Sequence, residues 1–66
     1  MKTYYIEGRY PTWARWRKLM PKPHGERFPI GKTGEIRFKD RDKAEFALIE
    51  IALANTGEYR IIEEEI

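Results

Sequence analysis

The chain has 66 residues, which is enough for one small domain of modest stability, because a domain of this size buries only about 60% of the surface that its unfolded chain exposes. It contains no cysteine and a single histidine, which excludes disulfide bonds, cysteine–zinc centres and multi-histidine metal sites. The net charge is +2, and with 41% apolar residues the composition is too apolar for intrinsic disorder.

The first predicted element is a strand over residues 3–10, where aromatic and β-branched residues dominate. Within it, Gly8 indicates a bulge or a close backbone approach. Residues 12–20 are compatible with two structures. Pro11 suits the first position of a helix, but a strand over about residues 15–19, paired with the first strand, is slightly favoured.

Prolines and glycines punctuate residues 21–34, which are predicted to be a loop region. Phe28 and Ile30 are expected to form a short edge strand, because Pro29 cannot donate to a strand ladder. The turn 31–34 then leads the chain back into a strand over residues 35–38.

The best-defined element is a helix over residues 41–55, with Asp40 as its N-cap and Gly57 in the left-handed closing position. A last strand follows over residues 58–65. One stripe of the helix is expected to face the core, and its members are Ala44, Ala47, Leu48, Ile51 and Ala52.

These elements predict a single α+β domain over residues 1–66, in the order β-β-(β)-α-β. The expected architecture is a two-layer sandwich in which one helix lies on a small, mostly antiparallel sheet. Because many unrelated small domains share this layout, the fold alone indicates no function.

A second apolar face on the helix exceeds what one sheet requires. Phe46, Ile49 and Leu53 follow helical spacing on the side opposite the main stripe. Three covers are open for this face: residues 11–34 of the same chain, a second copy in a homodimer, or a different protein.

Motifs for catalysis are weak. Gly31-Lys32-Thr33 lacks the spacing of a phosphate-binding loop and precedes a predicted strand. His24 is expected to be a solvated loop residue, and without serine or cysteine the common acyl-transfer sites are excluded. The acidic run 63–65 suits a charged strand edge that blocks aggregation. We therefore expect no enzyme, no metal and no cofactor.

Charge is distributed unevenly along the chain. Residues 9–43 carry a net charge of +7 and residues 44–66 a net charge of −5. This asymmetry predicts a basic and an acidic side, with mutual pairing of the two regions as the alternative.

The strongest functional signal lies in residues 9–22, where cations alternate with large aromatic rings. Nucleic-acid-binding proteins use this combination, because cations neutralise phosphates and rings stack on unpaired bases. The alternative places the two tryptophans in the core. The predicted nucleic-acid contacts are Arg9, Trp13, Arg15, Trp16, Arg17, Lys18, Lys22, Arg37 and Lys39.

The sequence thus predicts a small binding protein of the cytoplasm, and nucleic acid is the favoured partner. No membrane partner is expected, since no apolar run approaches the ~20 residues that span a bilayer. The rival hypothesis is a modulator of a larger protein. It would bind through Phe46, Ile49 and Leu53 or through the acidic half of the chain.

Overall fold

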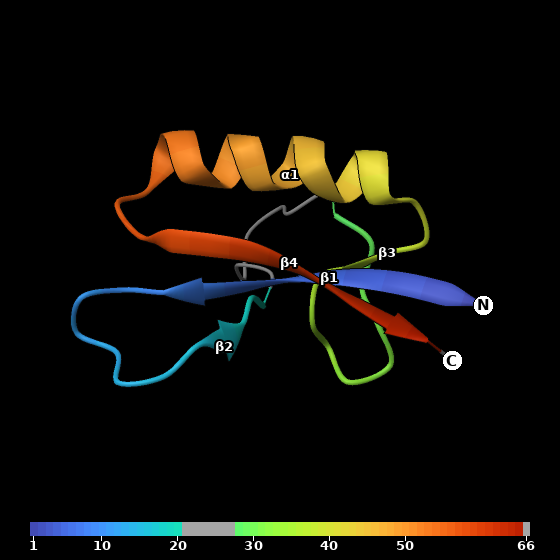
Figure 1. The fold of residues 1–66 in the computed structure, drawn as a ribbon, viewed down its shortest axis with the longest axis horizontal. Helices are drawn as coiled ribbons and strands as arrows, with labels where there is room; N and C mark the ends of the chain where they lie inside the picture. Colours follow the sequence, from blue (N-terminus) through green and yellow to red (C-terminus); the bar gives the residue numbers. More distant parts are fainter. Residues whose placement is uncertain (21–27, 66) are drawn as a thin grey trace.

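Strand β1 (Lys2–Arg9) is the centre of the sheet in the computed structural model, which describes residues 1–20 and 28–65. Strand β4 (Glu58–Glu65) pairs antiparallel with all eight residues of β1 along one edge. The other edge of β1 is shared by two short strands, β2 (Arg17–Lys18) and β3 (Arg37–Phe38). The predicted order of elements is confirmed (Figure 1).

Helix α1 (Arg41–Ala54) covers one face of this sheet, so the predicted two-layer α+β architecture is confirmed (Figure 1). Its N-cap is the predicted Asp40, whose side chain accepts a hydrogen bond from the backbone N–H of Asp42 at 3.0 Å. The buried core lies between the layers and consists of Ile6, Ile36, Phe38, Ala44 and Ala47.

The register of the strands decides which side chains face α1. Because paired residues point to the same side, Ile6 and its partner Ile61 face the helix together. Residues of the opposite parity point away from α1, onto what we call the rear face. The rear face is formed by Thr3, Tyr5, Glu7, Arg9, Lys18, Arg37, Glu58, Arg60, Ile62 and Glu64.

No helix forms in the described part of residues 12–20, which agrees with the favoured strand. β2 has only two residues, but the Leu19 N–H also donates to the carbonyl oxygen of Ile6 at 2.9 Å. At Gly8, where a bulge or a close backbone approach was predicted, the close neighbours are the side chains of Leu19 and Tyr59. A Cβ atom there would lie 2.9 Å from Cδ2 of Leu19, so the glycine is needed for this contact.

The turn 31–34 is also confirmed. The Gly34 N–H donates to the carbonyl oxygen of Gly31 at 3.1 Å, and Gly34 has a φ of 88°. In place of the short edge strand predicted for residues 28–30, a single bridge joins Ile30 to Ile36.

The end of the helix differs from the prediction. Gly57 does not adopt a left-handed conformation, because α1 ends at Asn55 in an extended conformation that carries the chain directly into β4. The role of Gly57 is close packing, since a Cβ atom there would lie 2.7 Å from the ring of Tyr10. Ala52, expected in the core, is exposed.

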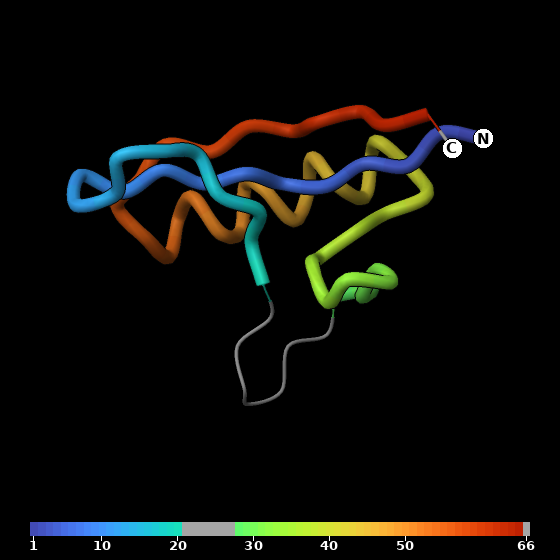
Figure 2. The backbone as a smooth tube through the Cα atoms, turned by 90° about the horizontal axis from the view of Figure 1, so that it is seen from below, coloured from blue at the N-terminus to red at the C-terminus, as the bar shows by residue number. Residues whose placement is uncertain are grey.

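The two ends of the described chain lie side by side, because Lys2 pairs with Glu65 (Figures 1 and 2). Of the residues that the structure describes, none belong to a helix with the length and apolar content that a membrane crossing requires.

Candidate nucleic-acid interface

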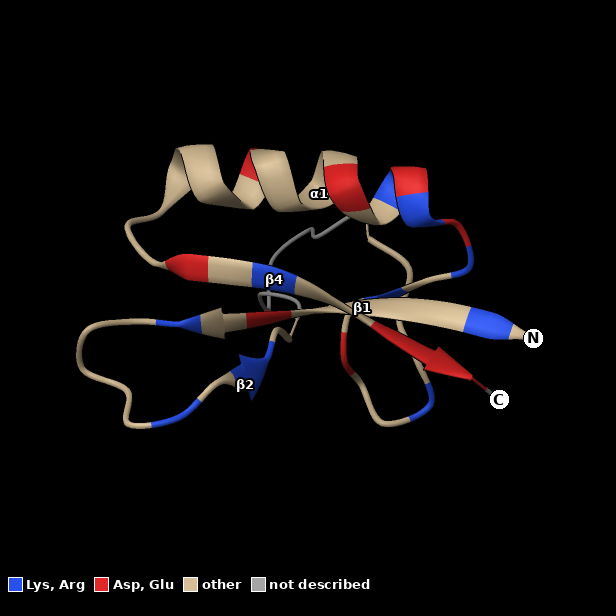
Figure 3. Ribbon diagram, viewed as in Figure 1, with Lys and Arg blue, Asp and Glu red and all other residues tan. Residues whose placement is uncertain are grey.

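The cations of residues 9–18 lie at one end of the sheet, where the chain passes from β1 to β2. The side chains of Arg9, Arg15, Arg17 and Lys18 are all exposed. None of these four forms an ion pair with an acidic residue in the described ranges. Figure 3 shows these basic positions along this connection and on β2. The 9–18 segment therefore keeps its positive charge in the folded chain.

This connection is held in place by aromatic contacts. The Trp13 N–H donates to the carbonyl oxygen of Tyr10 at 2.8 Å, and the two rings meet edge to face with centroids 4.5 Å apart. The Tyr59 hydroxyl of β4 donates to the Tyr10 hydroxyl at 3.0 Å. The cations are therefore presented on an anchored turn, which lowers the ordering cost of binding.

The two tryptophans lie on different sides of the sheet. Trp13 contacts Arg17, whose guanidinium carbon is 5.1 Å from the ring centroid. Arg17 pairs with Gly8 and thus faces the helix side. Trp16 instead contacts Arg60 of the rear face, with a guanidinium-to-centroid distance of 4.1 Å. Trp13 and Trp16 therefore belong to two separate cation–indole pairs, one of them with Arg60, which was not a predicted contact, and they do not share one stacking platform.

Each indole is half-buried, so neither interpretation of the sequence describes the tryptophans fully. They are absent from the buried core between the layers, yet each is partly covered by its neighbours. The exposed part of each ring is the part available to a ligand.

The glutamates of β4 pair mainly with the beginning of the chain. Glu63 contacts the Lys2 ammonium at 3.5 Å, and Glu65 contacts the N-terminal ammonium at 3.3 Å. Glu64 contacts Arg37 at 2.7 Å. Glu45, Glu63, Glu64 and Glu65 of the acidic half thus pair with cations outside the 9–18 segment. Among the described residues, the two charged regions pair with each other only through Arg37 and Arg41.

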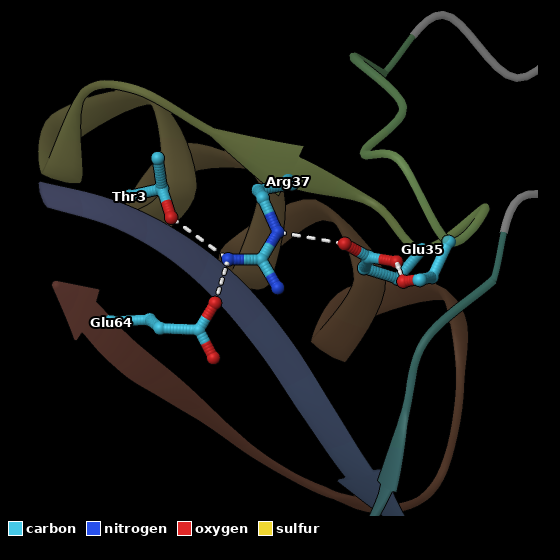
Figure 4. A network of polar contacts seen from close by, with 5 residues as sticks. Thr3, Glu35, Arg37 and Glu64 are labelled. Atoms are coloured by element: carbon cyan, nitrogen blue, oxygen red, sulfur yellow. Dashed lines mark hydrogen bonds and ion pairs between the residues drawn. The ribbon is translucent and has the colours of Figure 1, made fainter. Parts of the chain in front are cut away.

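Arg37 was predicted to contact phosphates, and its surroundings correct this interpretation. Its Nε donates to Glu35 at 2.7 Å, while its Nη1 donates to Thr3 at 2.8 Å and to Glu64 at 2.7 Å (Figure 4). Its side chain is 14% exposed. Because the guanidinium is already bound on two sides, Arg37 serves to tie β3 to β1 and β4.

The carboxylate of Glu35 belongs to the same network. It is buried, and it accepts hydrogen bonds from the Thr33 hydroxyl and from Arg37 (Figure 4). These two donors, first the hydroxyl and then the guanidinium, lower the pKa of Glu35 to about 2. The carboxylate stays charged at neutral pH, and it lies against Gly31, where any side chain would collide with it.

Beside this network, a groove of about 670 Å³ opens between the turn 31–34 and the start of α1. The structure brings four lysines to it, Lys18, Lys32, Lys39 and Lys43, and we call it the lysine groove. Two of them, Lys18 and Lys39, are among the contacts predicted from the sequence. The other two were missed because only the folding of the turn beside the first helical turn places them together. Of the remaining predictions, Lys22 and His24 lie outside the described residues.

The second apolar face of α1 is uncovered. Phe46 is 72% exposed, Ile49 54% and Leu53 84%. The intramolecular cover that we considered is therefore wrong for the described residues of 11–34, and the face is left to a partner or to solvent.

Comparison with known proteins gives no family for this chain. It matches no protein-family profile, no curated protein and no solved structure. A functional hypothesis must therefore rest on the chemistry of the surfaces described above.

Proposed function

We propose that this protein binds single-stranded nucleic acid, with the 9–18 segment as its principal contact. One observation carries the proposal: the acidic half of the chain does not neutralise this segment. Glu63, Glu64 and Glu65 of β4 are engaged by Lys2, Arg37 and the N-terminus. The four cations of the 9–18 segment have no ion-pair partner in the part of the chain described, although Arg9 pairs in the sheet with Glu58.

The arrangement favours single strands over duplexes. Unpaired cations at one end of the sheet would replace the counterions of a phosphate backbone. The exposed parts of Trp13 and Trp16 offer stacking surfaces, and stacking contributes about 1–3 kcal/mol per base. Because the bases of a duplex already stack on one another, this gain is available only from unpaired bases. Since the two indoles lie on different sides of the sheet, we expect stacking on each ring separately.

The test is a titration with a mixed-sequence single strand of about 16 nucleotides, made as DNA and as RNA, over a series of salt concentrations. Affinity should fall steeply with salt. In the variant Arg9→Gln/Arg15→Gln, the slope of log K against log salt should decrease by about 1.4, which is about 0.7 for each lost contact. Both side chains are exposed, so the fold should remain intact.

The matched control is Lys2→Gln/Arg41→Gln, which removes the same charge from cations that are paired with Glu63 and Glu45. Its salt slope should stay close to that of the unmodified protein. The proposal fails if the unmodified protein binds neither strand at low ionic strength, or if both double variants lower the slope equally.

A second candidate function, binding of a partner protein, is favoured by the exposure of Phe46, Ile49 and Leu53. Burying such side chains contributes about 1.5–3 kcal/mol each. In the variant Phe46→Gln/Leu53→Gln, capture of a protein partner after nuclease treatment should be lost, whereas the control Glu50→Gln should retain it. The molar mass in solution separates a homodimer from binding of a different protein. Lack of enzymatic activity and a cytoplasmic location stay predictions.

A further inference from the structure

We propose that the lysine groove binds the phosphodiester backbone of the same single strand, beyond the part that contacts the 9–18 segment. This inference rests on the proposed function and extends it to a second set of residues. The groove is assembled by folding: β3 connects the turn that carries Lys32 to the helix start that carries Lys43. Its volume of about 670 Å³ leaves room for a chain segment.

The charges in the groove favour an anion. Lys18, Lys32, Lys39 and Lys43 form no ion pair with the described residues. The acidic residues of the lining are already engaged. Glu35 and Glu64 bind Arg37, and the Asp40 carboxylate accepts the Asp42 N–H. The described lining therefore carries five cations, the four lysines and Arg37, against three carboxylates, and its net charge of +2 favours an anion.

The described lining of the groove offers its lysines to phosphates but no exposed ring on which a base could stack. Its one aromatic ring, that of Phe38, is buried in the core. The nearby ring of Tyr5 is also buried, with Lys18 Nζ and the Arg37 guanidinium carbon each 4.8 Å from its centroid. An ammonium group binds phosphate as a point charge, without the fork that reads base edges. The groove should therefore contact the backbone regardless of sequence.

Lys18 connects the groove to the proposed interface. It lies on β2, at the end of the 9–18 segment, and it also lines the groove. A strand that stacks on Trp16, whose partner Arg60 shares the rear face with Lys18, can thus continue past Lys18 towards Lys32 and Lys43. The two regions would divide the contacts, with bases at the indoles and phosphates in the groove.

The experiment compares the unmodified protein with Lys32→Gln/Lys43→Gln, using a single strand of about 16 nucleotides and tryptophan fluorescence as the signal. We expect the salt slope to decrease by about 1.4. The change in fluorescence at saturation should be unchanged, because both tryptophans lie in the 9–18 segment. A second variant, Lys39→Gln/Lys43→Gln, leaves the turn 31–34 intact and should behave alike. Lys2→Gln/Arg41→Gln again serves as the matched control.

The outcomes separate this inference from the function on which it rests. If the unmodified protein binds no strand, the proposed function itself fails. If it binds, and both groove variants keep the salt slope of the control, the lysine groove is not part of the interface and the inference is overturned. A lowered slope together with a lowered fluorescence change would also overturn it, because the groove would then not act separately from the indoles.

Discussion

The Glu35 carboxylate and the Arg37 guanidinium form an ion pair of 2.7 Å between two residues that are two positions apart in the chain. Both partners are largely shielded from solvent, and each has further hydrogen bonds, Glu35 from Thr33 and Arg37 to Thr3 and Glu64. Shielded pairs with satisfied hydrogen bonds resist disruption, because removal of one partner leaves the other charge uncompensated. This pair fixes β3 next to the lysine groove.

Acid should weaken the protein through Glu35. Its pKa in the folded protein, about 2, lies below the ordinary value of 4.5, so its contribution to stability is present above pH 4.5 and is lost as the pH falls through about 2. Glu35→Gln should be less stable at neutral pH and should lose less stability on acidification. Denaturant unfolding at several pH values measures both effects. Glu50→Gln, an exposed control, should follow the unmodified protein, and identical pH profiles for all three proteins would contradict the prediction.

Alkali should weaken the protein through Tyr59. Burial, together with the hydrogen bond to Tyr10, raises the pKa of Tyr59 from 10.0 to about 12. The contribution of the protonated Tyr59 hydroxyl to the free energy of unfolding is therefore complete below pH 10 and is lost as the pH rises through about 12. Tyr59→Phe should reduce this alkaline loss, as measured by unfolding at increasing pH. Tyr4→Phe is the control, because no hydrogen bond joins the Tyr4 hydroxyl to another described residue; an equal effect of both variants would refute the assignment.

Gly34 is required for its backbone conformation alone. Its φ of 88° is unfavourable for residues with a Cβ atom, yet nothing lies within 4 Å of the position that a Cβ would occupy. Gly34→Ala should therefore cost about 1–2 kcal/mol. Gly34→Asn should cost less, because asparagine adopts positive φ more readily. Equal losses for the two variants in equilibrium unfolding would show that the backbone conformation is not the cause.

Two isoleucines should respond very differently to the same substitution. Ile6 is fully buried, so Ile6→Ala should lower the free energy of unfolding by about 2–5 kcal/mol. Ile49 is 54% exposed on the outer face of α1. In a monomer, Ile49→Ala should therefore change the free energy of unfolding by no more than about 0.5 kcal/mol. A large loss for Ile49→Ala that depends on protein concentration would instead reveal a homodimer through this face.

The elements that the sequence predicted well are those with local signals. The alternation around Ile6, the N-cap Asp40 and the last strand each depend on residues close in the chain, and β1, α1 and β4 formed as expected. Gly57 was misinterpreted, because close packing against Tyr10 and a left-handed helix end both call for glycine. Only the spatial neighbour distinguishes them.

Composition and local pattern by themselves determined a small α+β domain, its single main helix, the second apolar face of that helix and the basic character of residues 9–43. Tertiary structure decided which charges remain unpaired. In the folded chain, Arg37 is bound by Glu35 and Glu64. Trp13 and Trp16 lie on different sides of the sheet, and Lys32 and Lys43 line one groove. The physical reason is that ion pairing and ring contacts depend on distances of a few ångströms between residues far apart in the chain, and strand register sets those distances.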